Sequence, residues 1–313
     1  MAEITYLSLE TPHVGHLVWI RALRALGYKV NVIGVRGLSR TIKSGAVLIT
    51  EGVRPTLLGA VLRPLYRCWV AVAMSPAILS PAVRALYRLP DVVASVSSLV
   101  RELVNSASVV LYPAPPELEA LLKLTDHDMK NPWVCYSGVF IPIKGLHMVP
   151  YIALRLKNEG VRARIVLIGG LQDEPMWRLV ASKARRLGVE DYVTLVERVP
   201  RAFLFRLLRK CAVYLQPALF DAFPLSVVEA MALGLVPVVT KYVGSGDLVE
   251  LIDKSLVRRP QPDDIAEALM RLMTDERILR EYSRPSKDVV KNALSFEAVK
   301  SRISALVEMC MRR

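Results

Sequence analysis

Two acidic residues in the second half of the chain stand at a spacing that can serve a nucleotide. Asp221 lies in a short loop after an apolar, strand-like run, and Glu229 lies about one turn inside the helix predicted next. The first amides of that helix, at Leu225 and Ser226, have no intrahelical partner, and the helix dipole makes this end positive. It can therefore hold a phosphate. A carboxylate within the helix is better placed to accept hydrogen bonds from hydroxyls, such as those of a ribose.

The residues from Phe220 to Val239 also carry a family resemblance. They resemble the E-x7-E motif and the following EAMA-x-G-x-P-V-V run of the family 4 (group 1) retaining glycosyltransferases of the GT-B fold. The resemblance implies that Glu229 holds the ribose and that Asp221 lies near the transferred sugar. It further implies that the start of the helix, including Phe223, Leu225 and Ser226, contributes to the donor site.

A glycine-rich loop adds a cation to this predicted site. The run from Ser137 to Gly145 resembles the family's G-R-x4-K-G loop, with Gly138 and Lys144 at the matching positions. In the family, the arginine and the lysine of this loop clamp the donor diphosphate. Here Val139 occupies the arginine position, so a bidentate cation is missing. Ile165–Gly170 and Val243–Glu250 match further family elements less closely.

The resemblance predicts a metal-independent enzyme of the EC 2.4 class that needs no cofactor. It would move a sugar from a UDP- or GDP-linked donor to an acceptor and retain the anomeric configuration, with Asp221, Lys144 and Glu229 as catalytic residues. Two alternatives stay open. Val139 and Asp221 fit a catalytically weakened member that binds nucleotide or glycan as a partner subunit. A nucleic-acid-binding protein is the third reading, and its one support is the net charge of +13.

The elements that must position these residues alternate between strand and helix along the whole chain. Short apolar runs separated by helical segments predict parallel, doubly wound sheets. Turn residues near 113–132 mark a boundary between two domains. We therefore predict an α/β, GT-B-like protein with two Rossmann-like domains facing across a cleft. The predicted divisions are an acceptor-side domain at 1–125, a nucleotide-sugar domain at 131–295 and a helix at 296–313 that can pack on the first domain.

The first domain offers few candidates for acceptor binding. His13 and Gly15 lie in the turn after the first predicted strand, and His16 follows them. In the predicted fold this turn faces the cleft, so we assign His13 and Gly15 to the acceptor side. A histidine that only stabilises the turn, or is merely exposed, is the alternative. The sequence leaves the acceptor open between a lipid-linked molecule and a glycan.

Composition bounds the location and the partners. Hydrophobic residues make up 53% of the 313 residues, but charged and turn residues interrupt every long apolar run, so no membrane span is predicted. The four cysteines are far apart, which argues against a zinc site and a disulfide scaffold and favours a reducing cytosol. We expect a cytoplasmic protein, with a peripheral position at the inner membrane face left open. The scarcity of Asn and Gln hints at a thermophilic source.

Two further segments have weak functional signals. Asp126-His127-Asp128 matches a D-x-D metal signature, but it falls in the predicted linker, so we predict no metal site. The basic run from Arg198 to Lys210 alternates with apolar residues. It fits either a membrane-surface face or an amphipathic helix that packs on a core, with the arginines reaching solvent.

Overall fold

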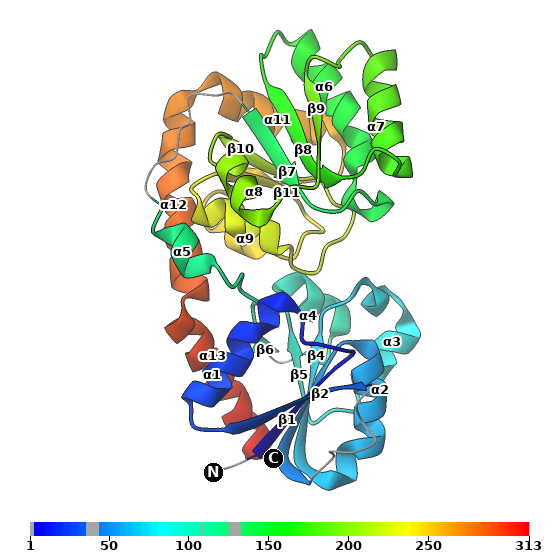
Figure 1. Ribbon diagram of the computed structural model, residues 1–313, viewed down its shortest axis with the longest axis vertical. Helices are drawn as coiled ribbons and strands as arrows, with labels where there is room; N and C mark the ends of the chain where they lie inside the picture. Colours follow the sequence, from blue (N-terminus) through cyan, green and yellow to red (C-terminus); the bar gives the residue numbers. More distant parts are fainter. Residues whose placement is uncertain (1–2, 36–43, 108, 125–132, 313) are drawn as a thin grey trace. The chain divides into compact units, whose positions relative to one another are not determined.

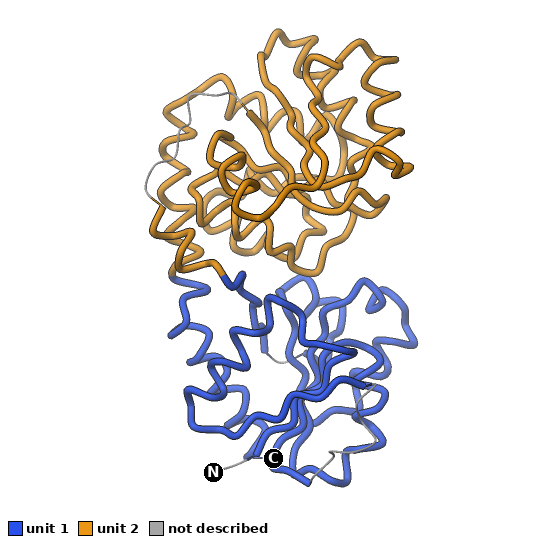
Figure 2. Tube along the Cα trace, viewed as in Figure 1, with its two compact units in different colours: residues 1–116, 292–313 blue, residues 117–291 orange. Residues whose placement is uncertain are grey.

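The computed structural model describes residues 3–35, 44–107, 109–124 and 133–312, and its elements form two parallel sheets (Figure 1). The chain divides into two compact units (Figure 2). Unit 1 comprises residues 1–116 and 292–313, and unit 2 comprises residues 117–291. The Asp126-His127-Asp128 run lies outside the described residues.

Unit 1 is built on a six-stranded sheet in the order β2-β1-β3-β4-β5-β6. Helices α1 and α13 pack against each other on one face of the sheet, and α2 covers the other (Figure 1). Its strands are β1 (Glu3–Ser8), β2 (Lys29–Gly34), β3 (Gly45–Glu51), β4 (Tyr66–Ala73), β5 (Val92–Ser95) and β6 (Val109–Val110). Its helices are η1 (Val14–His16), α1 (Leu17–Ala25), α2 (Val53–Leu62), η3 (Arg63–Leu65), η4 (Pro76–Leu79), α3 (Pro81–Leu86), α4 (Ser98–Val104) and α13 (Phe296–Met311).

Unit 2 has a six-stranded sheet in the order β12-β11-β10-β7-β8-β9, the arrangement of a dinucleotide-binding fold. Its strands are β7 (Trp133–Ser137), β8 (Arg164–Gly170), β9 (Val193–Glu197), β10 (Val213–Gln216), β11 (Val236–Thr240) and β12 (Val257–Arg258). Its helices are α5 (Leu118–Leu122), η5 (Pro142–Lys144), η6 (Leu146–Met148), α6 (Val149–Asn158), α7 (Pro175–Arg186), α8 (Arg201–Leu208), α9 (Leu225–Ala232), α10 (Gly246–Glu250), η7 (Lys254–Leu256), α11 (Pro262–Thr274) and α12 (Glu276–Leu294). Strand interiors such as Val134, Leu215 and Val238 are fully buried, as expected for a sheet covered on both faces.

The boundaries of the units differ from the predicted ones at both crossings. Residues 117–124 belong to unit 2 and not to the first domain, because α5 packs against α9. The chain returns to unit 1 at Asn292, within α12. The C-terminal helix α13 packs against α1, β3, β4 and β5 of unit 1.

Helix α12 contains an internal proline. A proline commonly ends a helix, yet α12 continues to Leu294 with Pro285 inside it. A proline removes one hydrogen bond from a helix interior. Val290 and Leu294 beyond it are buried, and this packing outweighs the local cost.

The expectation that the cysteines stay unpaired is wrong. Cys68 on β4 and Cys310 on α13 form one disulfide within unit 1, and Cys135 and Cys211 form a second within unit 2. Cys211 lies two residues before β10, the neighbour of β7 in the sheet, so folding brings it beside Cys135. Pairs this far apart in sequence give no local signal. The argument from cysteine usage for a reducing compartment is therefore lost.

The described helices include none with the length and apolar character needed to cross a membrane.

Candidate functional site

The candidate residues of unit 2 gather where the strand order of its sheet reverses. β7 is the first strand of this sheet in sequence, yet it lies between β8 and β10. The crossover after β7 therefore leaves toward one side, and the strands after β9 are added on the other. In open α/β sheets this point, at the carboxyl ends of the strands, is where ligands bind. The loops that follow β7 and β10 both start here.

These two loops are locked together by their backbones. The amide of Leu219 donates a hydrogen bond of 2.8 Å to the carbonyl of Ile143. Gly145 has a φ of +71°, and a Cβ at this position would lie 1.9 Å from the carbonyl oxygen of Pro217. Only glycine fits such a contact in this conformation. The close approach fixes the end of the β7 loop, and with it the adjacent Lys144.

Lys144 and Asp221 form an ion pair across the two loops. Lys144 Nζ lies 2.5 Å from Asp221 Oδ2, and the two side chains are 20% and 12% exposed. The backbone of Asp221 is held in turn by Tyr242 and Gly244, which it meets through hydrogen bonds of 3.0 and 2.8 Å. The predicted phosphate-binding lysine therefore has a carboxylate partner, which an anionic ligand would have to share or replace.

The amino end of α9 lies directly after this loop. Pro224 is its N-cap residue, and the helix has no side-chain cap there in the described part of the chain. The amides of Leu225 and Ser226 are thus among the free donors of the first turn. Phe223, which we predicted to bind the donor, is largely buried before the helix. Tyr214 on β10 connects the end of β7 to the start of α9, since its hydroxyl bonds both the backbone of Ser137 and the side chain of Ser226.

Glu229 projects from α9 and is almost completely buried, with 4% of its surface exposed. Its Oε1 accepts a hydrogen bond of 2.7 Å from Arg201, the first residue of α8. The same guanidinium donates two bonds of 2.9 Å to Glu117, just before α5. We did not predict Arg201 or Glu117. A signal was present, because a carboxylate in an otherwise apolar helix such as α9 requires a cation or several donors.

A pocket opens beside the glycine loop. It has a volume of about 240 Å³ and is lined by the ends of β7 and β8 and by residues that follow β9: Ser137, Gly138, Val139, Ile168, Gly169, Arg198, Val199 and Leu204. Gly138 and Gly169 touch here, since a Cβ on Gly169 would lie 2.6 Å from the carbonyl oxygen of Gly138. Val139 is half exposed at this pocket. Arg198, which we had treated only as part of a basic run, is the cation among the lining residues.

The predicted acceptor-side residues of unit 1 belong to a buried polar cluster around Glu51, the last residue of β3. Glu51 accepts hydrogen bonds from Tyr6 (2.8 Å) and the backbone amide of His13 (2.7 Å), and its Oε2 lies 3.2 Å from Nδ1 of His16. Although burial raises it, these donors, led by His16, hold the pKa of Glu51 below its usual value. Burial lowers the pKa of His16.

Only one of the two histidines in this turn is open to a ligand. His16 is 1% exposed and stacks on Trp19, with ring centroids 3.8 Å apart, so the expectation that it faces a cleft is wrong. His13 is exposed, and its Nδ1 accepts a hydrogen bond from the amide of Gly15. Gly15 itself is buried and its carbonyl accepts from the amide of Ala114.

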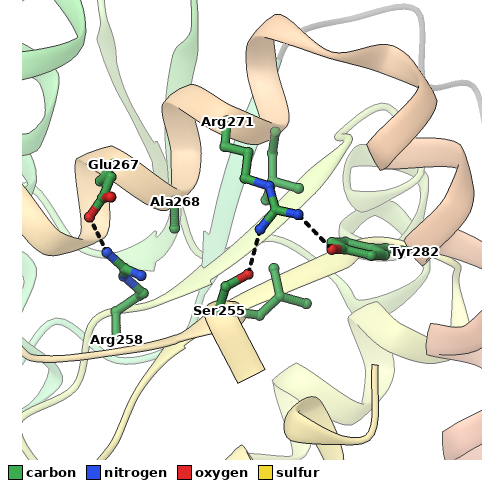
Figure 3. A pocket seen from close by; sticks show the side chains of 8 residues that line it. Ser255, Arg258, Glu267, Ala268, Arg271 and Tyr282 are labelled. Atoms are coloured by element: carbon green, nitrogen blue, oxygen red, sulfur yellow. Dashed lines mark hydrogen bonds and ion pairs between the residues drawn. The ribbon is translucent and has the colours of Figure 1, made fainter. Parts of the chain in front are cut away.

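A second pocket of unit 2 lies between β12, α11 and α12 (Figure 3). Its charged side chains have partners among the lining residues: Arg258 pairs with Glu267, and Arg271 donates to the hydroxyls of Ser255 (2.8 Å) and Tyr282 (3.0 Å). None of the predicted site residues lines it. Within the described ranges there is also no group of His, Cys, Asp and Glu that could hold a metal ion.

Comparison with known proteins places this site in context. The family model described as "Glycosyl transferases group 1" matches residues 119–289, more than half of the chain. The chain is similar to an MMP α-(1→4)-mannosyltransferase of Mycolicibacterium hassiacum, with 25% identity over 94% of this chain and 75% of the relative. It also resembles a sucrose synthase of Denitrovibrio acetiphilus, with 30% identity over 36% of this chain. That match spans 17% of the sucrose synthase.

Solved structures show the same architecture. Anabaena HepE in complex with UDP has a TM-score of 0.78 and 16% identity, and the alignment covers 98% of this chain and all of HepE. Sucrose-phosphate synthase from Thermosynechococcus elongatus has a TM-score of 0.75 and 17% identity, with 98% of each chain covered. The predicted α/β, GT-B fold is thereby confirmed, and so is the family resemblance. The chain belongs to the group 1 family of glycosyltransferases.

Proposed function

We propose that the protein transfers a sugar from a UDP- or GDP-linked donor to an acceptor, with retention of the anomeric configuration. The observation that carries the proposal is the convergence of three groups at the reversal point of the unit 2 sheet. These groups are Lys144, the uncapped amino end of α9 and the buried carboxylate of Glu229. Lys144 and the amino end of α9 are suited to bind the diphosphate, and Glu229 is suited to bind the ribose. HepE, similar in fold, has been solved in complex with UDP and with UDP-glucose.

Arg198 is proposed to supply the second cation for the diphosphate. Val139 stands where the family motif has arginine, and it lines the same pocket as Arg198. A nucleoside diphosphate carries more charge than Lys144 alone can neutralise, particularly because Lys144 is paired with Asp221. An exposed arginine can turn its planar fork toward phosphate oxygens. Arg198 would thus supply the positive charge that is missing at Val139.

The chemistry of the transfer is electrostatic in this proposal. As the bond between the sugar and the diphosphate breaks, negative charge grows on the leaving group. Lys144, Arg198 and the amides of Leu225 and Ser226 would then hold the diphosphate more strongly than in the ground state, which accelerates the step. Binding of the diphosphate to Lys144 would also release Asp221 toward the sugar hydroxyls. We propose that no metal or other cofactor is needed.

The acceptor side rests on fewer observations. We propose that His13, whose Nδ1 is occupied by Gly15, offers its Nε2 to a lipid-linked or glycan acceptor. We propose a cytoplasmic location, at times at the membrane face, to which the two disulfides lend no support. We also propose that nucleic acid is not a partner.

One observation favours a second function, that of a non-catalytic partner subunit. Val139 removes a cation from the motif, and a weakened site can bind a donor without turning it over. Incubation with UDP-glucose, UDP-N-acetylglucosamine and GDP-mannose, followed by chromatography of the nucleotides, distinguishes a transferase from a non-catalytic partner subunit. An enzyme releases UDP or GDP slowly by transfer to water, and Lys144→Ala abolishes the release. Donor binding with no release by the wild-type protein would contradict transfer and support the partner role.

A further inference from the structure

Glu229 lies in surroundings that should not hold a carboxylate without help. It is 4% exposed, and its neighbours along α9, Val227, Val228, Ala230 and Met231, are buried apolar residues. Moving a carboxylate out of water costs several kcal/mol unless charges or donors replace the water. Arg201 bonds one of its two oxygens at 2.7 Å.

Arg201 is itself held in one orientation. Its Nε and Nη2 form a two-bond fork with the carboxylate of Glu117, at 2.9 Å each, and Nη2 also reaches Glu229 at 2.7 Å. The guanidinium carbon lies 5.1 Å from the ring centroid of Phe205, one turn along α8. Glu117 is the first residue of unit 2 and precedes α5, which packs against α9. Arg201 therefore links three helices at the carboxylate.

The ionisation of Glu229 depends on the balance of these groups. Burial raises the pKa of Glu229, Arg201 lowers it, and the charge of Glu117 raises it. From β10, Tyr214 faces the same region, and burial raises the pKa of that tyrosine to about 12, so it stays neutral in the working range. Although burial lowers it, the bonds to Glu117 and Glu229 hold the pKa of Arg201 above its usual value. Arg201 is therefore the cation on which the charge of Glu229 rests.

We infer that Arg201 is a positioning residue for the donor site: it keeps Glu229 ionised and directs its second oxygen to the ribose hydroxyls. The inference rests on the proposed function, in which Glu229 receives the ribose. With Oε1 bonded to Arg201, the ribose hydroxyls would meet Oε2, which accepts from both of them only while it carries no proton.

The pH dependence of nucleotide affinity tests this role. Titration calorimetry with UDP and GDP is carried out at several values between about pH 6 and pH 9, and the tighter nucleotide is used. Without Arg201, the pKa of Glu229 rises further, so Glu229 in Arg201→Met gains a proton at a higher pH than in the wild type. Affinity is then lost as the pH falls, and each unit of pKa shift costs the variant up to about tenfold in Kd at the acidic end. Near pH 9 Glu229 is ionised in both proteins, so the difference in affinity narrows to what the loss of the directing contact costs.

Further variants separate this role from general damage to the fold. Arg201→Lys keeps the charge without the fork and should show an intermediate shift. Arg206→Met, an exposed arginine on the same helix, should leave the pH profile unchanged. In a double-mutant cycle, Arg201→Met should cost nothing further in a Glu229→Gln background, because its effect passes through Glu229.

The possible failures are distinguishable. If Glu229→Gln weakens nucleotide binding while Arg201→Met and Arg201→Lys keep the wild-type pH profile, the inference about Arg201 is wrong and the donor site stands. Costs that add in the double variant would overturn it as well. If the wild type binds neither UDP nor GDP, the proposed function itself fails.

Discussion

At the scale of single residues, the proposed donor site has few cations for a diphosphate. Lys144 is paired with Asp221 and Arg201 with two glutamates, so neither is a free charge. Arg198 is exposed and lines the pocket that also contains Val139. We therefore propose that Arg198, the residue after β9, supplies the cation that the family motif places on the glycine loop. Val139 and Arg198 can therefore be tested together by substitution.

Removing the side chain of Arg198 should weaken nucleotide binding. A charge-assisted contact contributes about 1.5–3 kcal/mol, so Arg198→Ala should raise the Kd for UDP or GDP by about tenfold or more. Restoring an arginine on the other wall, in Val139→Arg/Arg198→Ala, should recover most of the affinity, as measured by calorimetry. Arg206→Ala, at an exposed arginine of α8 outside the pocket lining, serves as the control. Wild-type affinity in Arg198→Ala would show that Arg198 does not touch the diphosphate.

At the scale of elements, the site is created by two loops at the reversal of strand order. The loop after β7 is folded into two short turns, η5 and η6, with Gly145 between them in the left-handed conformation. The loop after β10 passes so close that its Pro217 carbonyl occupies the space of a Cβ. The position of Lys144 opposite Asp221 follows from this contact.

A side chain at Gly145 should therefore disturb both stability and binding. Gly145→Ala adds strain from its positive φ and forces the Pro217 carbonyl away, which should cost about 2 kcal/mol or more in the free energy of unfolding. Gly160→Ala is a matched control, because Gly160 has a φ of +69° with no atom near its added Cβ. It should cost about 1 kcal/mol and leave nucleotide affinity intact. Urea unfolding measures the stability, and nucleotide titration measures the affinity. Equal losses of stability and affinity in Gly145→Ala and Gly160→Ala would contradict the role of the close contact with Pro217.

Sequence patterns predict the strands and helices but not which side chains bond to one another across them. The alternation of apolar runs and helical segments predicts the two parallel sheets, because buried parallel strands such as Val92–Ser95 and Val236–Thr240 are short apolar runs between turns. Arg201 escaped prediction because its partners, Glu117 and Glu229, lie on other elements. Where the chain places Lys144, Asp221 and Glu229 agrees with the motif, but their roles remain predictions.

At the scale of the whole molecule, each unit contains a disulfide. Cys68 and Cys310 are 242 residues apart in sequence, and their bond ties the last helix, α13, to the central strand β4 of unit 1. α13 also covers that sheet through buried side chains such as Ile303 and Leu306. The disulfide therefore fixes the C-terminal segment of the chain to the sheet of unit 1 by a covalent bond.

Loss of this bond should lower the stability of unit 1. Cys68→Ser/Cys310→Ser should destabilise the oxidised protein by about 2–4 kcal/mol, mainly because the unfolded chain is no longer constrained. Thermal unfolding of the variant and the wild type checks this, and the difference should vanish when both are reduced. Peptide mapping of the unreduced wild type should find Cys68 joined to Cys310. Four free thiols in that protein would contradict the pairing.

Binding of nucleotide at the loops of unit 2 is the central claim, and titration calorimetry of the intact protein with UDP and with GDP tests it most directly. We expect one of them to bind with a Kd in the micromolar range, about −8 kcal/mol or less favourable. Lys144→Met should weaken that binding by at least about tenfold, since it removes the lysine nearest the proposed diphosphate. The matched variant Lys157→Met, an exposed lysine that bonds the carbonyl of Gly188, should bind as the wild type does. Heat of binding that is absent for both nucleotides, or unchanged in Lys144→Met, would contradict the account.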